Sequence, residues 1–415
     1  MKILIVSQYF WPETFIINDL VKALAQQGHQ IVVATGKPNY PEGHIYDGYS
    51  RSGTQREEFI PGVEVVRVPL RPRKGGGGFN LICNYLSFVF SGMLRFPWLL
   101  RGHRFDTILV FTPSPITAAL PAILLKYLMP SHLAVWVQDI WPESLAATGF
   151  VRNTVALRWV GCLVRWIYAR SDTLLVQSEA FLVPVMRYAP RDKIVYYPNA
   201  VDTVFFQEES SEPLPVVLES VMKSHFCVVF AGNLGSAQAL EGIVEAAKIL
   251  SAWPQVRFLL VGVGSRLDWL QQQVLACGLD NIVLAGRYPV SVMPELFKRA
   301  DALLVTLNSD EIFSQTVPSK IQAYLAAGRP IIAALNGEGA RVVKQAGAGL
   351  TCPAEDAPAL ASAVREMFEL SPFQRESMGA AGRAYALEHF EINRQARRLV
   401  TILQQRIDLS KKGID

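Results

Sequence analysis

The sequence predicts an α/β protein made of two doubly wound, Rossmann-like domains, each built on a parallel sheet. Strand-length apolar runs recur along the 415 residues, and helix-length stretches separate most of them. The rhythm is interrupted by the polar, proline-containing stretch QEESSEPLP at 207–215 and then restarts. Nearly continuous apolar strands that alternate with helices are typical of parallel sheets covered on both faces.

The apolar runs define the expected strands in two series, one on each side of the polar stretch. Helices are expected between them at 240–250, 267–276 and 321–327, and a basic helical segment is expected from 380 to 407. The expected strands are 2–10, 30–35, 63–68, 106–112, 133–139, 173–178 and 194–199 in the first series, and 226–233, 257–264, 281–287, 302–307 and 330–335 in the second.

These series set the expected domain boundaries. Residues 1–200 form an N-terminal domain, residues 201–385 form a second domain, and residues 386–415 form a helical segment that can return to the first. Ligands of doubly wound sheets bind outside the carboxyl ends of the strands. Two such domains facing each other would therefore bring both sets of strand-end loops to one cleft.

Composition narrows the class of protein. Half of the residues are hydrophobic, which is enough for two domains that each bury a core. The five Cys residues include no C-x-x-C pair, which argues against a disulfide framework or a zinc knuckle and favours a reducing cytosol. A strand follows Met1 at once and leaves no room for a cleavable signal, so we expect the protein to stay inside the cell.

Charge is distributed unevenly along the chain. Residues 1–200 carry 20 Lys and Arg against 13 Asp and Glu, a net charge of +7, whereas residues 201–415 carry 20 against 23, a net charge of −3. A basic half can serve nucleic acid or anionic lipid. Because Arg71, Arg73 and Lys74 stand directly before the apolar run 79–100, we expect an anionic membrane surface as partner and no nucleic acid.

Two helical stretches bear on that expectation. The uncharged run 79–94 is shorter than the ~20 residues that span a bilayer, and four polar residues recur in it at helical spacing and predict a polar face: Asn80, Asn84, Ser87 and Ser91. The stretch 154–170 repeats Arg158 and Trp159 seven residues later as Arg165 and Trp166. That pattern fits an interfacial helix and also a helix packed on the sheet.

Glycine or polar turns follow four expected strands of the second series. They lie at 231–238, 261–265, 285–289 and 316–320, and the last one leads into the helix 321–327. Such turns offer backbone N–H groups without a bulky side chain in the way, and a helix N-terminus favours a phosphate. One such turn is a weak signal, but four in order indicate a phosphate-bearing ligand.

These turns and several longer words resemble the family 4 glycosyltransferases of the GT-B fold class. Within that family they resemble the bacterial O-antigen and capsule branch that includes the WbuB-type L-fucosamine transferases. The words are SQYFWPE, PNYPEG, VQDIWPES, PNAVDTVFF, AGNLGSAQ, AGRYP and VPSKIQAYLAAGRP, and they cover nearly the full length.

The resemblance implies an activity and its partners. It implies a retaining, metal-independent hexosyltransferase that moves a sugar from a nucleoside diphosphate, with UDP as the first to expect and N-acetyl-L-fucosamine or a related sugar as cargo. It implies a lipid-linked saccharide as acceptor, a place in surface polysaccharide biosynthesis, and a peripheral location on the cytoplasmic face of the inner membrane. No cofactor is expected, and the absence of D-x-D and of His at ligand spacing agrees with the expectation of no metal.

The sequence departs from the family at three charged positions. The Arg and Lys that hold the donor diphosphate in the family are Asn233 and Gln238 here, and the final-loop glutamate is Ala323. We therefore expect Lys320, with Ser319 and the helix start, to meet the diphosphate, because charge-assisted hydrogen bonds are roughly twice as strong as neutral ones. Alternatively, Ser319 only caps the helix and Lys320 is solvated.

The remaining candidates follow the ends of other strands. Glu311 can replace the first family glutamate, Asp139 and Glu143 follow the strand 133–139, and Glu13 follows the first strand near the acceptor. Capping is the alternative role for Asp139. The expected catalytic residues are Asp139, Lys320 and Glu311; the expected acceptor residues are Glu13 and Glu143; the expected donor residues are Gly232, Asn233, Gly235, Gln238, Gly262, Gly264, Arg287, Tyr288, Ser319 and Gln322, although helical spacing puts Gln322 on the wrong face.

Two other functions share parts of this pattern. A sugar-nucleotide epimerase has the same two-domain architecture but needs no lipid surface. A catalytically silent nucleotide-sugar-binding protein would explain the missing charged residues. Slow release of sugar from the donor without acceptor would indicate a transferase, whereas epimer formation would indicate the epimerase.

Overall fold

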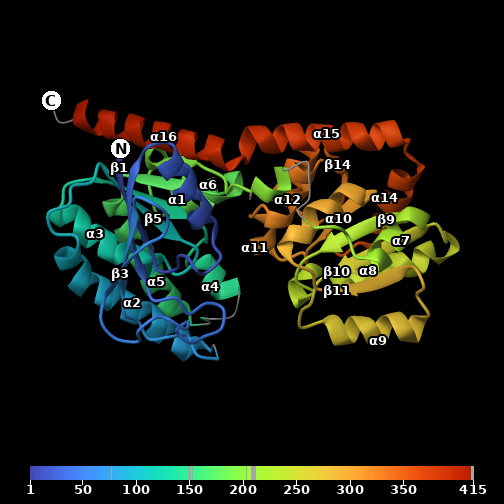
Figure 1. Cartoon of the computed structure of the whole chain (residues 1–415), viewed down its shortest axis with the longest axis horizontal. Helices are drawn as coiled ribbons and strands as arrows, with labels where there is room; N and C mark the ends of the chain where they lie inside the picture. The colour runs from blue at the N-terminus through green and yellow to red at the C-terminus, as the bar shows by residue number, and fades with distance from the viewer. Residues whose placement is uncertain (76, 148–150, 152, 202, 207–211, 413–415) are drawn as a thin grey trace. The chain divides into compact units, whose positions relative to one another are not determined.

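The computed structural model describes residues 1–75, 77–147, 151, 153–201, 203–206 and 212–412. The chain divides into two compact units (Figure 1). The first consists of Met1–Asn199 with Ile392–Asp415, and the second of Ala200–Glu391. The second unit ends at Glu391, whereas the sequence prediction placed this boundary at residue 385, inside helix α15 (Pro372–His389). The basic C-terminal segment, expected as one helix, forms two helices that separate after His389.

The first unit contains an eight-stranded sheet in the order β3-β4-β2-β1-β5-β6-β7-β8. Neighbouring strands are parallel except β3 and β4, which are antiparallel. Side chains on both faces of the central strands are buried, as expected for a sheet with helices on each side. The strands are β1 (Lys2–Ser7), β2 (Gln30–Gly36), β3 (Gln55–Glu58), β4 (Val63–Val68), β5 (Thr107–Thr112), β6 (His132–Val137), β7 (Thr173–Val176) and β8 (Ile194–Tyr196).

Helices cover both faces of this sheet. Helix α3 packs against α2 and α5, and α1 packs against the C-terminal helix α16. The helices are α1 (Ile16–Gln26), α2 (Gly78–Leu99), α3 (Ala119–Leu128), α4 (Glu143–Ala147), α5 (Thr154–Arg170), α6 (Leu182–Met186) and α16 (Ile392–Lys412), with 3-10 turns at Ile116–Ala118, Glu179–Phe181 and Arg191–Lys193.

The second unit contains a six-stranded parallel sheet in the order β11-β10-β9-β12-β13-β14. The strand order reverses between β9 and β12, which is the switch point of a Rossmann sheet. Separate hydrophobic clusters fill its two faces. The strands are β9 (Phe226–Ala231), β10 (Val256–Val261), β11 (Ile282–Gly286), β12 (Ala302–Thr306), β13 (Ile331–Ala334) and β14 (Gly349–Cys352).

The helices of the second unit alternate with its strands, as the sequence predicts. They are α7 (Val216–Ser224), α8 (Leu240–Ile249), α9 (Leu267–Cys277), α10 (Met293–Arg299), α11 (Glu311–Ser314), α12 (Ser319–Ala327), α13 (Glu338–Gln345), α14 (Ala357–Glu369) and α15, with 3-10 turns at Thr203–Phe206, Ser236–Gln238, Leu250–Ala252 and Val290–Val292. The predicted fold class, two doubly wound α/β units, is confirmed.

Polar residues of the stripe predicted on α2 form hydrogen bonds within the first unit and do not simply face solvent. Asn84 is fully buried, accepts a hydrogen bond from Gln8 Nε2 at 2.6 Å and donates one to the carbonyl oxygen of Arg71 at 2.6 Å. The backbone N–H of Arg71 donates to Ser87 Oγ at 2.8 Å. The polar side chains therefore fix the segment before the helix, and apolar side chains are left at the surface.

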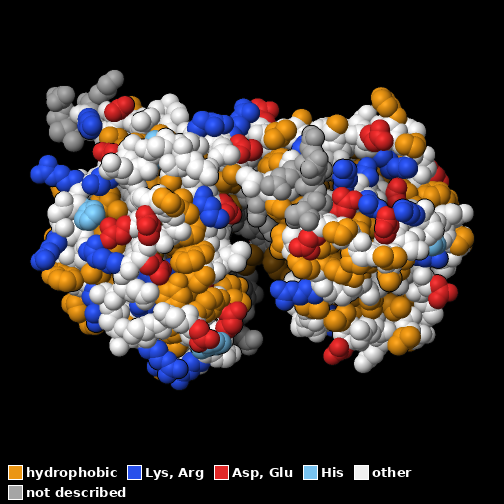
Figure 2. All heavy atoms as spheres, viewed as in Figure 1, with side chains coloured by type: hydrophobic (Ala, Val, Ile, Leu, Met, Phe, Trp, Pro, Cys, Tyr) orange, Lys and Arg blue, Asp and Glu red, His pale blue; other side chains and the backbone are white. Residues whose placement is uncertain are grey.

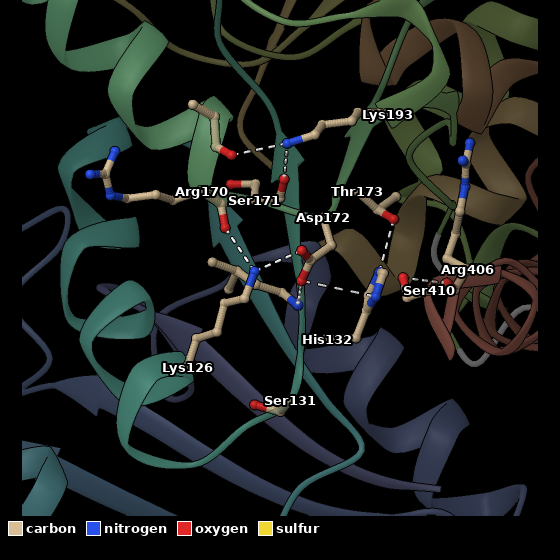
Figure 3. A network of polar contacts seen from close by, with 12 residues as sticks. Lys126, Ser131, His132, Arg170, Ser171, Asp172, Thr173, Lys193, Arg406 and Ser410 are labelled. Atoms are coloured by element: carbon tan, nitrogen blue, oxygen red, sulfur yellow. Dashed lines mark hydrogen bonds and ion pairs between the residues drawn. The ribbon is translucent and has the colours of Figure 1, made fainter. Parts of the chain in front are cut away.

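A polar network ties together the amino ends of β6 and β7 (Figure 3). Asp172 accepts hydrogen bonds from Lys126 Nζ at 2.7 Å and from the backbone N–H of Leu133 at 2.8 Å, and His132 Nε2 lies 2.9 Å from Thr173 Oγ1. Burial lowers the pKa of His132. Because these groups lie at the edge opposite the carboxyl ends of the strands, we assign them to the fold and not to a ligand site.

Arg67 on β4 is a buried cation that supports the loop after β1. Its guanidinium pairs with Glu57 of β3, donates to the carbonyl oxygens of Gly36, at 3.0 Å, and of Trp11, and stacks over Tyr49 at 5.1 Å. The side chain is 0% exposed. A buried charge with this many partners fixes the geometry of the loop that carries Glu13.

We expect Arg67→Ala to destabilise the first unit by about 3 kcal/mol, because removing one partner of a buried ion pair leaves the other uncompensated. The thermal unfolding transition of the first unit measures this loss of stability. The matched control is Arg51→Ala, an exposed arginine whose loss should change stability by less than about 0.5 kcal/mol. Equal midpoints for the two variants would contradict the role given to Arg67.

Candidate functional site

A cavity of about 660 Å³ lies at the carboxyl edge of the second sheet. The ends of β9, β10 and β11 and the first turns of α12 surround it. This volume lies in the range of small-molecule sites, and the position at the strand-order reversal is where doubly wound sheets bind ligands. Of the residues proposed from sequence, the cavity is lined by Gly232, Asn233, Gly262, Arg287, Tyr288, Ser319, Lys320 and Gln322.

Two glycines let the strand-end loops approach one another at the cavity wall. A Cβ at Gly262 would overlap the carbonyl oxygen of Gly232, and a Cβ at Gly232 would lie 2.5 Å from Cε of Lys320. Both glycines have positive φ, 144° for Gly232 and 146° for Gly262. The β9 and β10 loops can therefore close around the Lys320 side chain only because these positions lack side chains.

Lys320 is a partly buried cation of this site. Its Nζ lies 3.7 Å from the centroid of the Phe230 ring and donates a hydrogen bond to Gln238 Oε1. No carboxylate pairs with it among the residues that the structure describes, and burial lowers the pKa of its ammonium to about 7. The alternative that Lys320 is simply solvated is therefore wrong.

The start of α12 leaves its amide groups free of a side-chain cap. Pro318 is the N-cap residue, and no side chain caps the helix, so Ser319 is not its cap. The hydroxyl of Tyr324 accepts a hydrogen bond from the backbone N–H of Ala231 at 3.0 Å and anchors the helix to the end of β9. The exposed hydroxyl of Ser319 and the first amides of α12 are thus available to a ligand beside Lys320.

The loop after β9 supports the cavity from behind. Asn308, which follows β12, accepts a hydrogen bond from the N–H of Ala239 and donates one to the carbonyl oxygen of Ser236, both at 3.0 Å. Ala239 has φ +45°, an unfavourable conformation for a residue with a Cβ. Gly235, Gln238 and Gly264 lie in this supporting layer, where Gln238 meets Lys320 and the two glycines make room for the Asn233 side chain.

Two predictions on the far side of the cavity have different outcomes. Gln322 is buried and lines the cavity, so the assignment to the wrong helical face is wrong, and Ala323 lines it as well. Glu311 is exposed at the start of α11 and is not among the residues that line the cavity. In the short helix α11, Glu311 Oε1 accepts a hydrogen bond from Gln315 Nε2 at 3.4 Å, one turn later in the chain.

The apolar wall of the cavity was not found from sequence. It includes Phe205 and Phe297, whose rings stack with centroids 5.8 Å apart, together with Val263, Val290 and Met293. The cavity also holds a second cation, Arg287, and no Asp or Glu is among the described residues that line it. An apolar wall, two cations and no acid suit a ligand with a flat ring and an anionic group.

Asp139 lies after β6 in the first unit. Its Oδ1 accepts a hydrogen bond from Ser144 Oγ at 2.6 Å, and burial raises the pKa of its carboxyl group, partly offset by the Ser144 hydrogen bond. Ser144 lies in α4, so the pair joins the strand end to that helix, although the donor is a side-chain hydroxyl and not a backbone N–H that a cap would bind.

Glu143 opens α4 and faces α6 and the residues after it. Its Oε1 lies 3.5 Å from Arg187 Nη1 and accepts a hydrogen bond from the hydroxyl of Tyr188 at 3.5 Å. Its Oε2 is buried and has no hydrogen-bond partner among the described residues. None of the described contacts joins Glu143 to Asp139 or Glu13.

Glu13 is a buried clamp between two loops. Its oxygens accept hydrogen bonds from the backbone N–H groups of Phe10 at 3.2 Å, Asn39 at 2.7 Å and Tyr40 at 2.8 Å. The side chain is 1% exposed, and burial raises the pKa of its carboxyl group to about 7 against the effect of these hydrogen bonds. We therefore assign Glu13 to positioning the loops and not to direct contact with an acceptor.

The loops that Glu13 joins carry residues that sequence reasoning missed. The guanidinium of Arg73 lies 4.8 Å from the ring centroid of Tyr40 and 6.0 Å from that of Tyr9. Both tyrosines lie inside words quoted above, SQYFWPE and PNYPEG, so those words marked the place but not the side chains.

Comparison with known proteins decides the family. Residues 15–200 match the family described as "Glycosyl transferase 4-like domain", and residues 225–369 match "Glycosyl transferases group 1". The chain belongs to the family 4 glycosyltransferases. Within the described residues, no group of three or more His, Cys, Asp or Glu could hold a metal ion.

Two curated proteins are similar to this glycosyltransferase. WbjE of Pseudomonas aeruginosa, named as a glycosyltransferase, is 27% identical over 74% of this chain and 75% of its own. WcaI of Escherichia coli K12, named as a colanic acid biosynthesis glycosyl transferase, is 24% identical over 79% of this chain and 82% of its own. Neither relative is named as a WbuB-type transferase, so these comparisons support the family and not that branch.

Solved structures share the GT-B fold. HepE of Anabaena in complex with UDP superposes with a TM-score of 0.65 at 15% identity, covering 98% of this chain and 100% of that chain. Sucrose-phosphate synthase of Thermosynechococcus elongatus superposes with a TM-score of 0.73 at 16% identity, covering 97% and 98%. At these identities the likeness establishes the fold of this glycosyltransferase.

We expect Gly262→Ala to weaken UDP binding by about tenfold or more, because the added methyl group must push the β9 and β10 loops apart, at an overpacking cost of about 1–3 kcal/mol. Isothermal titration calorimetry measures the affinity. Gly242→Ala is the control, since a Cβ at Gly242 in α8 meets nothing within 4 Å. Unchanged UDP affinity in Gly262→Ala would show that the nucleotide does not depend on these loops.

We expect the affinity for UDP-glucose to fall by about fivefold as pH rises from about 7 to about 9. The free enzyme loses the Lys320 proton near pH 7, and an anionic ligand that raises this pKa by about one unit binds the protonated form about tenfold more tightly. UDP-glucose is the probe because its diphosphate diester does not titrate in this range. Lys320→Met should bind weakly at every pH, and a wild-type affinity independent of pH would contradict the assignment.

Proposed function

We propose that this glycosyltransferase moves a sugar, with retention of anomeric configuration, from a UDP-type donor to a lipid-linked saccharide during surface polysaccharide biosynthesis. The observation that carries the proposal is the partly buried ammonium of Lys320, which lies against the Phe230 ring without a carboxylate partner among the described residues and lines a cavity whose described wall has no acid. A cation kept out of water without a protein anion is suited to a ligand that brings the negative charge.

Lys320 would act mainly on the leaving group. Breaking the glycosidic bond increases the negative charge on the departing diphosphate, and a fixed cation in a dry site stabilises that charge more than it stabilises the ground state. Ser319, the first amides of α12 and Arg287 would add hydrogen bonds to the phosphate oxygens. Asn233 and Gln238 replace the family's cations: Asn233 can donate directly, and Gln238 orients Lys320.

The acceptor side follows from the retaining mechanism implied by the family. In front-face attack the donor phosphate receives the acceptor proton, so no separate catalytic base is required. We propose that Asp139 and Glu143 orient the acceptor, whereas Glu13 holds the loop after β1 against the loop after β2. Glu311 keeps only the sequence argument, because it lies outside the cavity wall.

The sugar and the membrane location are the finer parts of the proposal. WcaI is named for colanic acid biosynthesis, and HepE has been solved with UDP and with UDP-glucose, which supports a UDP donor in polysaccharide synthesis here. We propose N-acetyl-L-fucosamine or a related 6-deoxy sugar as the first cargo to test. We also propose a peripheral place on the inner face of the plasma membrane, which the net charge of +7 on residues 1–200 supports.

We expect Lys320→Ala to lower turnover by about 10²-fold, which is a barrier increase of ~3 kcal/mol, and to weaken donor binding by only about tenfold. Steady-state transfer and direct donor binding measure the two effects. The control is Lys248→Ala, which removes an exposed lysine paired with Glu245 on α8.

The same assay tests the function itself. It is run with EDTA, since we propose transfer without a metal. Normal turnover in Lys320→Ala would assign the phosphate to another cation. Epimerised donor among the products, or donor binding with neither transfer nor slow hydrolysis, would reject the transferase in favour of an epimerase or a binding protein.

A further inference from the structure

Helix α2 carries a continuous apolar stripe at the protein surface. Its members recur every three or four residues, so they lie on one side of the helix. Phe79 and Phe90 are 72% and 69% exposed, and Leu94 is 65% exposed. The stripe consists of Phe79, Ile82, Leu86, Phe90, Met93, Leu94 and Trp98. The helix has 22 residues and extends about 33 Å. The exposed apolar side chains therefore form a long contiguous patch, unlike the single exposed apolar residues that are common on protein surfaces.

The stripe is not needed for packing, because α2 uses other side chains for that purpose. Phe88, Gly92 and Phe96 are buried against the protein, and Gly92 lies close to Phe96 and Pro121 of α3. Asn84 and Ser87 hold the segment before the helix. The side of α2 that packs on the first unit is therefore complete, and the ring contacts described for the stripe are only those with arginines at its two ends.

Along the sequence, only cations flank the stripe. Residues 69–105 contain six Lys and Arg residues and no Asp or Glu. Arg71 lies over the ring of Phe79 at one end, at 5.8 Å, and Arg101 lies over the ring of Trp98 at the other, at 5.1 Å. Figure 2 shows hydrophobic side chains gathered over the lower part of this unit, where Figure 1 draws α2 and α5, with Lys and Arg side chains around them.

We propose that the stripe of α2 docks this enzyme on an anionic lipid bilayer, with the helix lying in the plane of the interface. The apolar side chains would enter the boundary between headgroups and acyl chains, while the cations at both ends meet lipid phosphates. Among the described residues no helix combines the length and apolar character needed to cross a bilayer. The inference rests on the membrane location proposed above and names the surface responsible.

Charge argues against a second copy of this chain as the occupant. Pairing two α2 helices about a twofold axis would bring Arg71, Arg73 and Lys74 of one copy beside Arg101 and Arg104 of the other, and like charges repel. An anionic bilayer offers negative charge along the whole stripe. Trp159 of α5 is also exposed, at 73%, which contradicts the packed alternative for that ring, and with Val155 and Trp166 it forms a shorter exposed apolar stripe on α5.

The test is flotation of the full chain with vesicles of one part phosphatidylglycerol to three parts phosphatidylcholine, compared with pure phosphatidylcholine. Phe90→Ser combined with Leu94→Ser should weaken binding to the anionic vesicles by at least about tenfold. The matched control is Phe373→Ser with Leu275→Ser, which removes a phenylalanine and a leucine exposed by 77% and 82% in the second unit. Arg71→Gln with Arg101→Gln should weaken binding by about fivefold for each charge removed.

Three results would overturn the proposal. They are wild-type protein that does not float with anionic vesicles at low salt, equal loss in the stripe variant and its control, or a dimer that the stripe variant dissociates. UDP-glucose binding by thermal shift is measured in parallel, because the stripe lies outside the donor cavity and should leave it unchanged. Vesicle binding without donor binding would reject the proposed function and keep the docking surface. Donor binding without vesicle binding would reject the docking surface and keep the proposed function.

Discussion

The desolvated ammonium of Lys320 is the constraint on which the donor site depends. A charge placed against the Phe230 ring, with one amide oxygen as partner, is held there at the expense of its own hydration. The glycines at 232 and 262, the anchor from Tyr324 to Ala231 and the strained Ala239 all keep the surrounding loops close enough to maintain that environment. Ala323, where the resemblance would place a carboxylate, lines the same cavity, so a bound anion would be the counter-charge of Lys320.

Most strands and helices of the second unit could be predicted, because its apolar strand runs and the helices between them alternate clearly in the sequence. Strands with uninterrupted aliphatic residues were visible, whereas β3 was missed because QREE has no apolar residue and pairs at the sheet edge, and β14 was missed because GLTC is short and begins with glycine. Lys320 was proposed because it stands at the start of the helix where a phosphate is expected, and the structure places it on the cavity wall. Gln322 was misplaced because spacing along an ideal helix does not fix how the helix is rotated against its sheet.

The first unit shows where sequence reasoning stops. Glu13 reads as a loop carboxylate near a substrate, but three backbone N–H groups from two separate loops converge on it, and only the folded chain brings those loops together. In α2 the polar residues were recognised, but composition could not say that they would face inward. In a globular protein, a polar stripe faces solvent unless buried partners such as Gln8 and Asn39 await it.

The return of α16 to the first unit has a consequence for how the chain folds. The hydroxyl of Tyr197 donates to the carbonyl oxygen of Gln395 at 3.1 Å, and Gln27 Nε2 donates to that of Asn393 at 2.9 Å, so the ends of the sequence are joined across the whole second unit. During synthesis the first unit stays without α16 until the whole second unit has been made, because α16 follows that unit in the sequence. The second unit, continuous from Ala200 to Glu391, has no such delay and can complete its core first. The first unit therefore begins to be synthesised before the second but can be completed only after it.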